Sequence, residues 1–146
     1  MVEIYKNAIS ANEQDLLDIL RARRFLIKDD ITRKECLTNA VTHRNYAISG
    51  EHTKIFIYDD RMEIVSPGDL PGIVTINNIK EKRYARNPII SRILTELGVV
   101  RELNEGVSRI YREMSEFFLE DPIYIEEKGV SLKLILKNNI VMRSKR

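Results

Sequence analysis

The order of two predicted β-hairpins and the helices around them constrains the fold of this 146-residue chain more than any other feature. Apolar residues alternate at 55–58 and again at 62–65, on the two sides of an Asp-Asp turn, which indicates the first hairpin. The second is predicted from strands at 123–125 and 130–136, which flank a Lys-Gly turn. Because strands and helices do not alternate one by one, we expect an α+β two-layer sandwich. Its sheet would be mixed and mostly antiparallel, with helices on one face.

Four helices are predicted from capping residues and from the helical spacing of apolar side chains. The third is the best defined, because Asn87 is expected to cap it, Pro88 suits its first turn and Gly98 suits its end. The stretch 73–86 lacks periodicity and has basic residues around Tyr84, so we expect a polar, mobile loop that could form a lid. The first helix is expected at about 11–24, after a capping box of Ser10 and Glu13. The second is expected to start at a capping box of Thr32 and Glu35. The last is expected from about 106 until Asp121-Pro122 ends it.

The helix predicted to start at Thr32 carries a polar stripe. Glu35, Asn39 and His43 are four residues apart, so they line up along one side of the helix. Small apolar residues occupy the opposite side, which can therefore be buried. This arrangement aims a carboxylate, an amide and an imidazole at one place, which is typical of a site. From spacing alone the alternative stays open, in which Glu35 is a helix cap and Asn39 a hydrogen-bonded residue at a helix–sheet contact.

The amino-acid composition limits the class of protein to which this chain can belong. The chain has the size of one compact domain, and its formal net charge of +2 neither requires nor excludes a nucleic-acid partner. Its single cysteine, Cys36, rules out an internal disulfide and a cysteine-rich zinc site. The N-terminus is charged where a signal peptide would be apolar, and long apolar runs are missing. We therefore expect a cytoplasmic protein that does not span a membrane.

Three segments taken together are similar to one known family. They are Arg33–Tyr46, with its Glu-Cys-Leu-Thr-Asn-Ala-Val-Thr-His-Arg-Asn-Tyr core, the run Tyr58–Pro71, and Arg86-Asn87-Pro88. Over most of its length the chain resembles the C-terminal domain of RecG-related, Schlafen/AlbA-associated transcriptional regulators, often labelled ATP-dependent DNA helicase-like. That family is in turn similar to the gyrase and histidine-kinase (GHKL, Bergerat-fold) ATPases. The resemblance implies one domain over 1–146 that is a fragment of a longer protein, with DNA bound by an N-terminal module.

The resemblance implies roles for residues on the polar stripe. In such ATPases one helix supplies a glutamate that polarises the attacking water and an asparagine that ligates Mg²⁺, here Glu35 and Asn39. His43 and Arg44 could reach phosphate, although a lone histidine on a helix is more often structural. The chain lacks the glycine-lysine phosphate loop of a helicase motor, so it is not a helicase by itself.

The two loops that hold ATP in those enzymes are altered here. Ser66 stands where an aspartate would bind adenine, Gly68 follows it, and Leu70 replaces a second glycine. An ordinary turn after a strand explains Pro67-Gly68 equally simply. In the phosphate loop, Gly106 is the one glycine of 104–108 and lies beside an acid. The sequence therefore predicts that binding of ATP and Mg²⁺ is weak or lost.

Three functions follow from these observations. We favour a regulatory or ligand-sensing domain of a DNA-associated regulator that can also self-associate. The first alternative is an active Mg²⁺-dependent ATPase that uses Glu35 and Asn39. The second is direct nucleic-acid binding through the basic residues of 21–28 or 80–86. The apolar faces of the last two helices are interpreted as core, and a homo-oligomer stays open.

Overall fold

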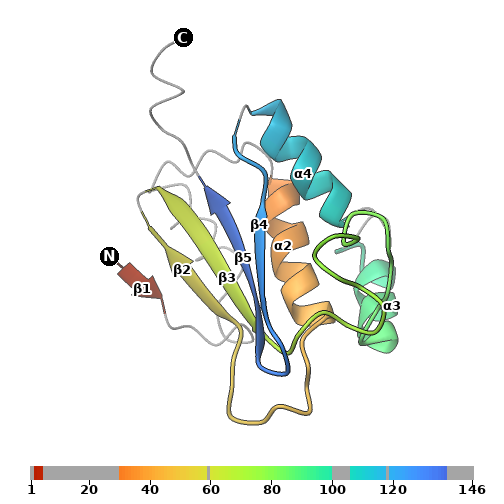
Figure 1. The fold of residues 1–146 in the computed structure, drawn as a ribbon. Coiled ribbons are helices and arrows are strands. Elements are labelled where there is room, and N and C mark those ends of the chain that lie inside the picture. Colours follow the sequence, from red (N-terminus) through yellow and green to blue (C-terminus); the bar gives the residue numbers. More distant parts are fainter. Residues whose placement is uncertain (1, 5–29, 59, 100–105, 118, 138–146) are drawn as a thin grey trace.

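The computed structural model describes residues 2–4, 30–58, 60–99, 106–117 and 119–137 (Figure 1). The helix predicted at about 11–24 and the chain end beyond 137 lie outside the described residues. The described elements are β1 (Val2–Ile4), α2 (Asp30–Thr42), β2 (Lys54–Ile57), β3 (Arg61–Pro67), α3 (Pro88–Glu96), α4 (Gly106–Glu116), β4 (Ile123–Glu127) and β5 (Ser131–Lys137). Among them, no helix has the length and apolar character needed to cross a membrane.

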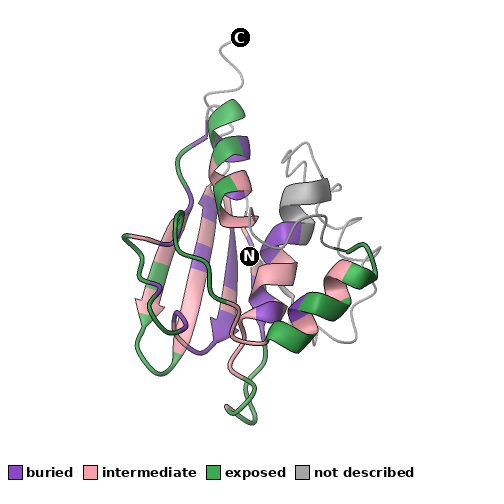
Figure 2. Cartoon of the chain, turned by 90° about the vertical axis from the view of Figure 1, so that its right-hand side faces the viewer, coloured by how far each residue is buried: buried purple, intermediate pink, exposed green. Residues whose placement is uncertain are grey.

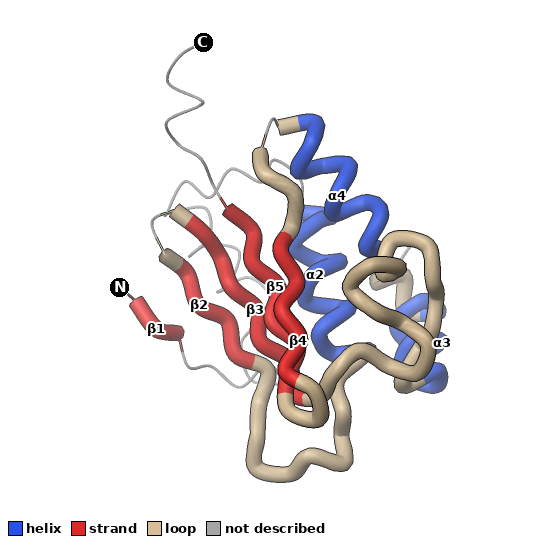
Figure 3. Tube along the Cα trace, viewed as in Figure 1, coloured by secondary structure: helices blue, strands red, loops and turns tan. Residues whose placement is uncertain are grey.

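The described strands form one sheet in the order β1-β2-β3-β5-β4, in which every pairing is antiparallel. Both predicted hairpins are present, β2 with β3 and β4 with β5. They are joined because β3 pairs with β5, from Arg61 opposite Lys137 to Pro67 opposite Ser131. The helices α2 and α4 lie on one side of this sheet (Figure 3). The predicted α+β sandwich, with helices on one face, is confirmed.

The core lies between the sheet and the two helices α2 and α4. Met62 and Ile64 of β3 are buried beside Leu134 and Leu136 of β5, because the strand register places them on the same face. From the helices, Cys36 and then Ile110 and Met114 complete this cluster, each at most 1% exposed. Burial of each large side chain contributes about 1.5–3 kcal/mol. The pKa of the Cys36 thiol is raised by burial, so this cysteine acts as a small apolar core residue.

Two helix starts differ from the prediction. The helix α2 begins at Asp30, so Thr32 lies inside it and does not cap it. Asn87 occupies the N-cap position of α3, but its side chain makes no capping hydrogen bond. Instead its Nδ2 donates to the backbone oxygens of Thr42, at 2.7 Å, and Arg44, at 2.8 Å. The side-chain amide of Asn87 thus binds carbonyl groups at the end of α2 and does not cap α3.

The apolar face of α3 does not lie in the core, contrary to the interpretation from the sequence. Ile89, Ile93 and Leu97 are 73%, 48% and 70% exposed, and Figure 2 shows α3 at the outer edge of the helical layer. The apolar face of α4 is buried as expected, through Ile110 and Met114. Helical periodicity identifies an apolar face but does not say which surface, if any, covers it.

Gly68 fixes the exit of β3 beside the segment that follows α2. Its φ of +98° is in the left-handed region, and an added Cβ would lie 2.5 Å from Cβ of Asn45. The two segments are also tied there, because Asn45 N donates to Pro67 O at 2.8 Å. The glycine is therefore required by close packing as well as by its backbone conformation.

We expect Gly68→Ala to destabilise the fold by about 3 kcal/mol, because it adds a steric clash to the cost of a positive φ. Gly50→Ala is the matched control, since Gly50 has a φ of +78° and open space around it. It should cost about 1 kcal/mol. Urea unfolding followed by circular dichroism measures both changes. Equal losses in the two variants would contradict the close contact with Asn45.

Candidate functional site

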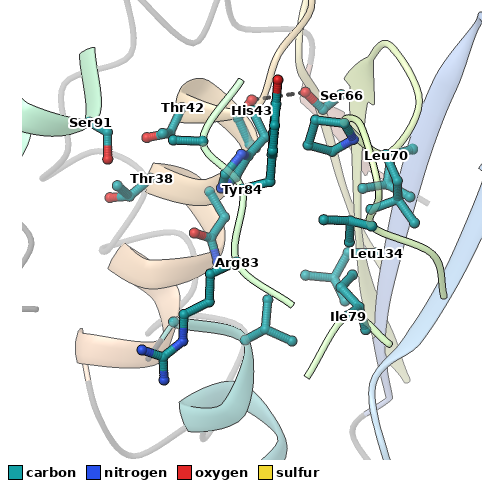
Figure 4. A pocket seen from close by; sticks show the side chains of 18 of the residues that line it. Thr38, Thr42, His43, Ser66, Leu70, Ile79, Arg83, Tyr84, Ser91 and Leu134 are labelled. Carbon is teal, nitrogen blue, oxygen red and sulfur yellow. Dashed lines mark hydrogen bonds between the residues drawn. The ribbon is translucent and has the colours of Figure 1, made fainter. Parts of the chain in front are cut away.

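A cavity of about 490 Å³ lies between α2, the end of β3, the segment 79–85, and the first turns of α3 and α4. One wall is polar and comes from α2, and the opposite wall is apolar and includes Leu70, Ile79 and Leu134 (Figure 4). The volume is within the range of sites that hold small organic ligands. The predicted site residues can be compared with the residues that line this cavity.

The polar stripe of α2 lines this cavity as one continuous wall. Glu35, Asn39 and His43 all line it, together with Thr42. Nδ2 of Asn39, Oγ1 of Thr42 and Nδ1 of His43 are buried and have no hydrogen-bond partner among the described residues. Burial and the nearby guanidinium of Arg86 lower the pKa of His43, so the imidazole is neutral at pH 7. Buried polar atoms without partners are uncommon in folded proteins and are therefore candidates for ligand contacts.

Glu35 is held by an arginine from α4. Its Oε1 lies 2.8 Å from Nη1 of Arg109, and the two side chains are only 7% and 13% exposed. Burial raises the pKa of Glu35, and the positive charge of Arg109 opposes that rise. Arg109 lies 74 positions away in the sequence, and no spacing signal in the chain pointed to it. The carboxylate thus lines the cavity as the ion-pair partner of Arg109 and not as an unpaired base.

Gly106 brings the start of α4 against the same wall. An added Cβ would lie 2.9 Å from Oε2 of Glu35 and 3.1 Å from Nδ2 of Asn39. A side chain at this position would therefore push α4 away from α2. Gly106 does line the cavity, but the contact that requires a glycine is this helix–helix approach.

The end of the cavity at Ser66 is closed by contacts within the protein. The Ser66 hydroxyl donates to the backbone oxygen of Ala40 at 2.8 Å, which ties β3 to α2. Its oxygen keeps lone pairs that can still accept a hydrogen bond. In the view of Figure 4 the ring of Tyr84 lies between His43 and Ser66. That ring packs on Gly72, whose added Cβ would lie 3.1 Å from it.

Basic side chains outnumber free acids around the cavity. Lys80, Lys82, Arg83 and Arg92 line it, whereas Glu35 and Asp69 are its only carboxylates among the described residues. Both carboxylates are paired with arginines, Glu35 with Arg109 and Asp69 with Arg86 at 3.1 Å. An NH of Gly129 and then Arg86 lower the pKa of Asp69, which is therefore ionised. The excess positive charge favours an anionic ligand.

The segment predicted as a lid is anchored on α4. Nζ of Lys80 lies 3.8 Å from the centre of the Tyr111 ring, and Oγ of Ser108 donates to the Lys80 backbone oxygen at 3.1 Å. At its far end, Nη2 of Arg86 donates to the Asp69 backbone oxygen at 2.6 Å. The segment thus spans the cavity and is fastened at both sides.

Arg44 does not join the other predicted site residues. It lies outside the cavity lining, and its Nη2 donates to the backbone oxygens of Glu51, at 2.6 Å, and Ile48, at 3.2 Å. Its guanidinium also stacks on the ring of Tyr46, 4.7 Å from the centroid. These contacts hold the loop after α2 together, and a contact between Arg44 and phosphate stays a prediction.

Asn39 is the residue that the resemblance implies as a ligand of Mg²⁺. Asn39 has an amide oxygen at the cavity wall, and Mg²⁺ is commonly held by one or two protein oxygens together with phosphates and water. The part of the chain that the structure describes contains no group of three or more His, Cys, Asp or Glu residues that could hold a metal.

We expect Arg109→Met to lower the free energy of unfolding by about 3 kcal/mol, because it leaves Glu35 buried without a counter-ion. Arg112→Met is the matched control on the same helix. Arg112 is exposed and lies 4.0 Å from Glu116, so its loss should cost under about 0.5 kcal/mol. The deficit of Arg109→Met should shrink as the pH falls, since a protonated Glu35 needs no cation. Urea titrations at two pH values measure this, and equal losses in both variants would be inconsistent with the buried pair.

We also expect part of the acid sensitivity of the fold to come from His43. Its pKa in the folded protein lies below the ordinary 6.5, so protonation favours the unfolded chain. The stability that neutral His43 provides is complete above the ordinary pKa of 6.5. It is lost as the pH falls from there through the lower pKa of the folded protein. His43→Gln should flatten the decline of unfolding free energy between about pH 7.5 and about pH 5.5. His52→Gln is the control, because His52 is the other histidine and is exposed. This variant should show the same decline of unfolding free energy as the unaltered protein.

Comparison with known proteins relates the chain to a family, by a match that begins after the polar stripe of α2. The family model described as "Putative ATP-dependent DNA helicase recG C-terminal" matches residues 50–136. The crystal structure of the DIP2311 protein from Corynebacterium diphtheriae is similar, with a TM-score of 0.71 and 25% identity. The match covers 86% of this chain and 26% of that one, so this chain spans about a quarter of that protein's length. No curated protein matches the chain. Because the family model spans more than half of the sequence, the chain belongs to this family of RecG C-terminal, ATPase-like domains.

Proposed function

We propose that this domain is the ligand-sensing part of a longer transcriptional regulator, and that it binds an adenine nucleotide weakly without hydrolysing it. The observation that carries the proposal is the ion pair of Glu35 and Arg109 at the cavity wall. In an ATPase of the related type, the carboxylate at this place has to act on water. Here one oxygen of Glu35 already accepts a hydrogen bond from the guanidinium of Arg109. The negative charge of Glu35 is therefore compensated within the protein.

The shape and charge of the cavity support a nucleotide as the ligand. Its basic lining suits phosphates, and its apolar wall at Leu70, Ile79 and Leu134 suits a base. Asn39 and Thr42 offer buried polar atoms that lack partners among the described residues. A ligand with an apolar ring and an anionic tail would satisfy both walls.

Recognition of the base is expected to be weak. Ser66 can accept one hydrogen bond but carries no charge, and its proton is already donated to Ala40. Tyr84 extends into the same region, so a bound base would have to stack on this ring or displace it. These features favour a sensor with modest affinity over an enzyme that turns ATP over.

An active ATPase is the second candidate. It is favoured by one observation, that Glu35 and Asn39 both reach the same cavity, beside Gly106. For hydrolysis Arg109 would have to release the carboxylate, which then could orient water, while a bound Mg²⁺ would stabilise phosphate charge beside Asn39. The nucleic-acid alternative and the DNA-binding module stay predictions. The basic residues of 21–28 lie outside the described residues.

Calorimetry of the purified chain with Mg-ATP should give a dissociation constant of about 100 µM or weaker. Lys82→Ala should weaken binding about threefold to tenfold, because Lys82 lines the cavity and its charge would attract the phosphates of a bound nucleotide. Lys128→Ala is the control, since Lys128 lies on the exposed β4–β5 turn outside the cavity lining. Phosphate release should stay at the background rate. Turnover that Glu35→Gln abolishes would establish the ATPase instead, and complete absence of binding would refute the nucleotide sensor.

A further inference from the structure

The helix α3 exposes an unusual amount of apolar surface. Ile89, Ile93 and Leu97 are spaced by four residues, so they form one line along the helix, and each is about half exposed or more. Single exposed apolar residues are ordinary, but an apolar line on one helix is the pattern of a buried helix face. Figure 2 shows mostly exposed and partly buried residues along α3, at the outer edge of the helical layer.

One flank of this line carries a pair of opposite charges. Nε of Arg92 lies 3.2 Å from Oε1 of Glu96, one turn further along the helix. Their side chains are 79% and 64% exposed, so the pair is available to a partner. A partner that covers the apolar line should therefore present an acid near Arg92 and a base near Glu96.

A second copy of the same helix meets that requirement when it runs antiparallel. A two-fold axis perpendicular to two antiparallel helices brings the same flank of each helix together, in reversed order. Arg92 of one copy then lies near Glu96 of the other, and the reverse contact forms at the same time. Antiparallel packing also opposes the helix dipoles favourably. A parallel pair would place the charged flank against the uncharged one and would leave these charges unmatched.

We propose that α3 is a homodimer surface, on which two copies of this chain pack antiparallel through the line of Ile89, Ile93 and Leu97. A single helix of nine residues buries less area than the roughly 800 Å² per partner of a stable complex. The dimer is therefore weak and dependent on concentration. None of these three apolar residues lines the cavity, so their test is separate from that of its ligand, whereas Arg92 both lines the cavity and flanks the apolar line.

Sedimentation equilibrium of the purified chain tests this, from low micromolar to submillimolar concentration. The unaltered chain should show a monomer–dimer equilibrium, and Ile93→Asp should raise the dissociation constant at least about tenfold. Ile73→Asp is the matched control, because Ile73 is 65% exposed and lies in another segment. Circular dichroism checks that each variant is folded. A chain that is monomeric throughout, or a dimer that Ile93→Asp does not weaken, would overturn the proposal.

Charge exchange tests the antiparallel arrangement itself. Arg92→Glu alone and Glu96→Arg alone should each weaken self-association, because like charges then meet across the axis. An equimolar mixture of the two variants should associate as tightly as the unaltered chain, since opposite charges meet again. Failure of the mixture to recover association would reject this arrangement, because loss of the helix pair within one copy predicts no recovery on mixing.

Discussion

The antiparallel pairing of β3 with β5 supports everything else in this structure. The two hairpins are separated in sequence by two helices and a long loop, and only this pairing makes them one sheet. Once the register is set, Met62 and Ile64 share a face with Leu134 and Leu136, and that face is the surface on which α2 and α4 pack. The end of the same strand carries Ser66, whose hydroxyl ties the sheet to α2. The cavity lies beside this contact and is lined by residues of α2 and of the strands.

The Glu35–Arg109 ion pair joins the polar stripe of α2 to α4 inside the protein. A glutamate and an asparagine stacked on one helix suit a nucleotide site, and both do reach a cavity. Yet the glutamate contributes its charge to the contact between α2 and α4, with Gly106 allowing the close approach. Two other polar side chains also make contacts within the protein. Arg44 and Asn87 donate hydrogen bonds to backbone carbonyl groups at and after the end of α2. The atoms left for a ligand belong mainly to Asn39, Thr42 and the basic segment from Lys80.

Much of the fold could be predicted because it depends on local patterns. Alternation with period two located the hairpins, and Pro88 with Gly98 located α3. Predictions that depended on one local partner were less accurate. Thr32 was expected to cap α2, but it lies inside that helix. Asn87 was expected to cap α3, but its side chain binds the end of α2, a contact that local sequence does not encode. For the site, the stripe of Glu35, Asn39 and His43 could be predicted, whereas Arg109 could not, because nothing in its spacing points to α2.

The amino-acid sequence by itself determined the two hairpins and which side chains of α2 share a face, since both follow from the backbone periods of 2 and 3.6. Only the tertiary structure decided what each face meets. It paired Glu35 with an arginine 74 positions away, and it left the apolar line of α3 exposed. The physical reason is that a contact between distant segments depends on how whole elements pack, and a periodic pattern carries no information about the surface opposite it.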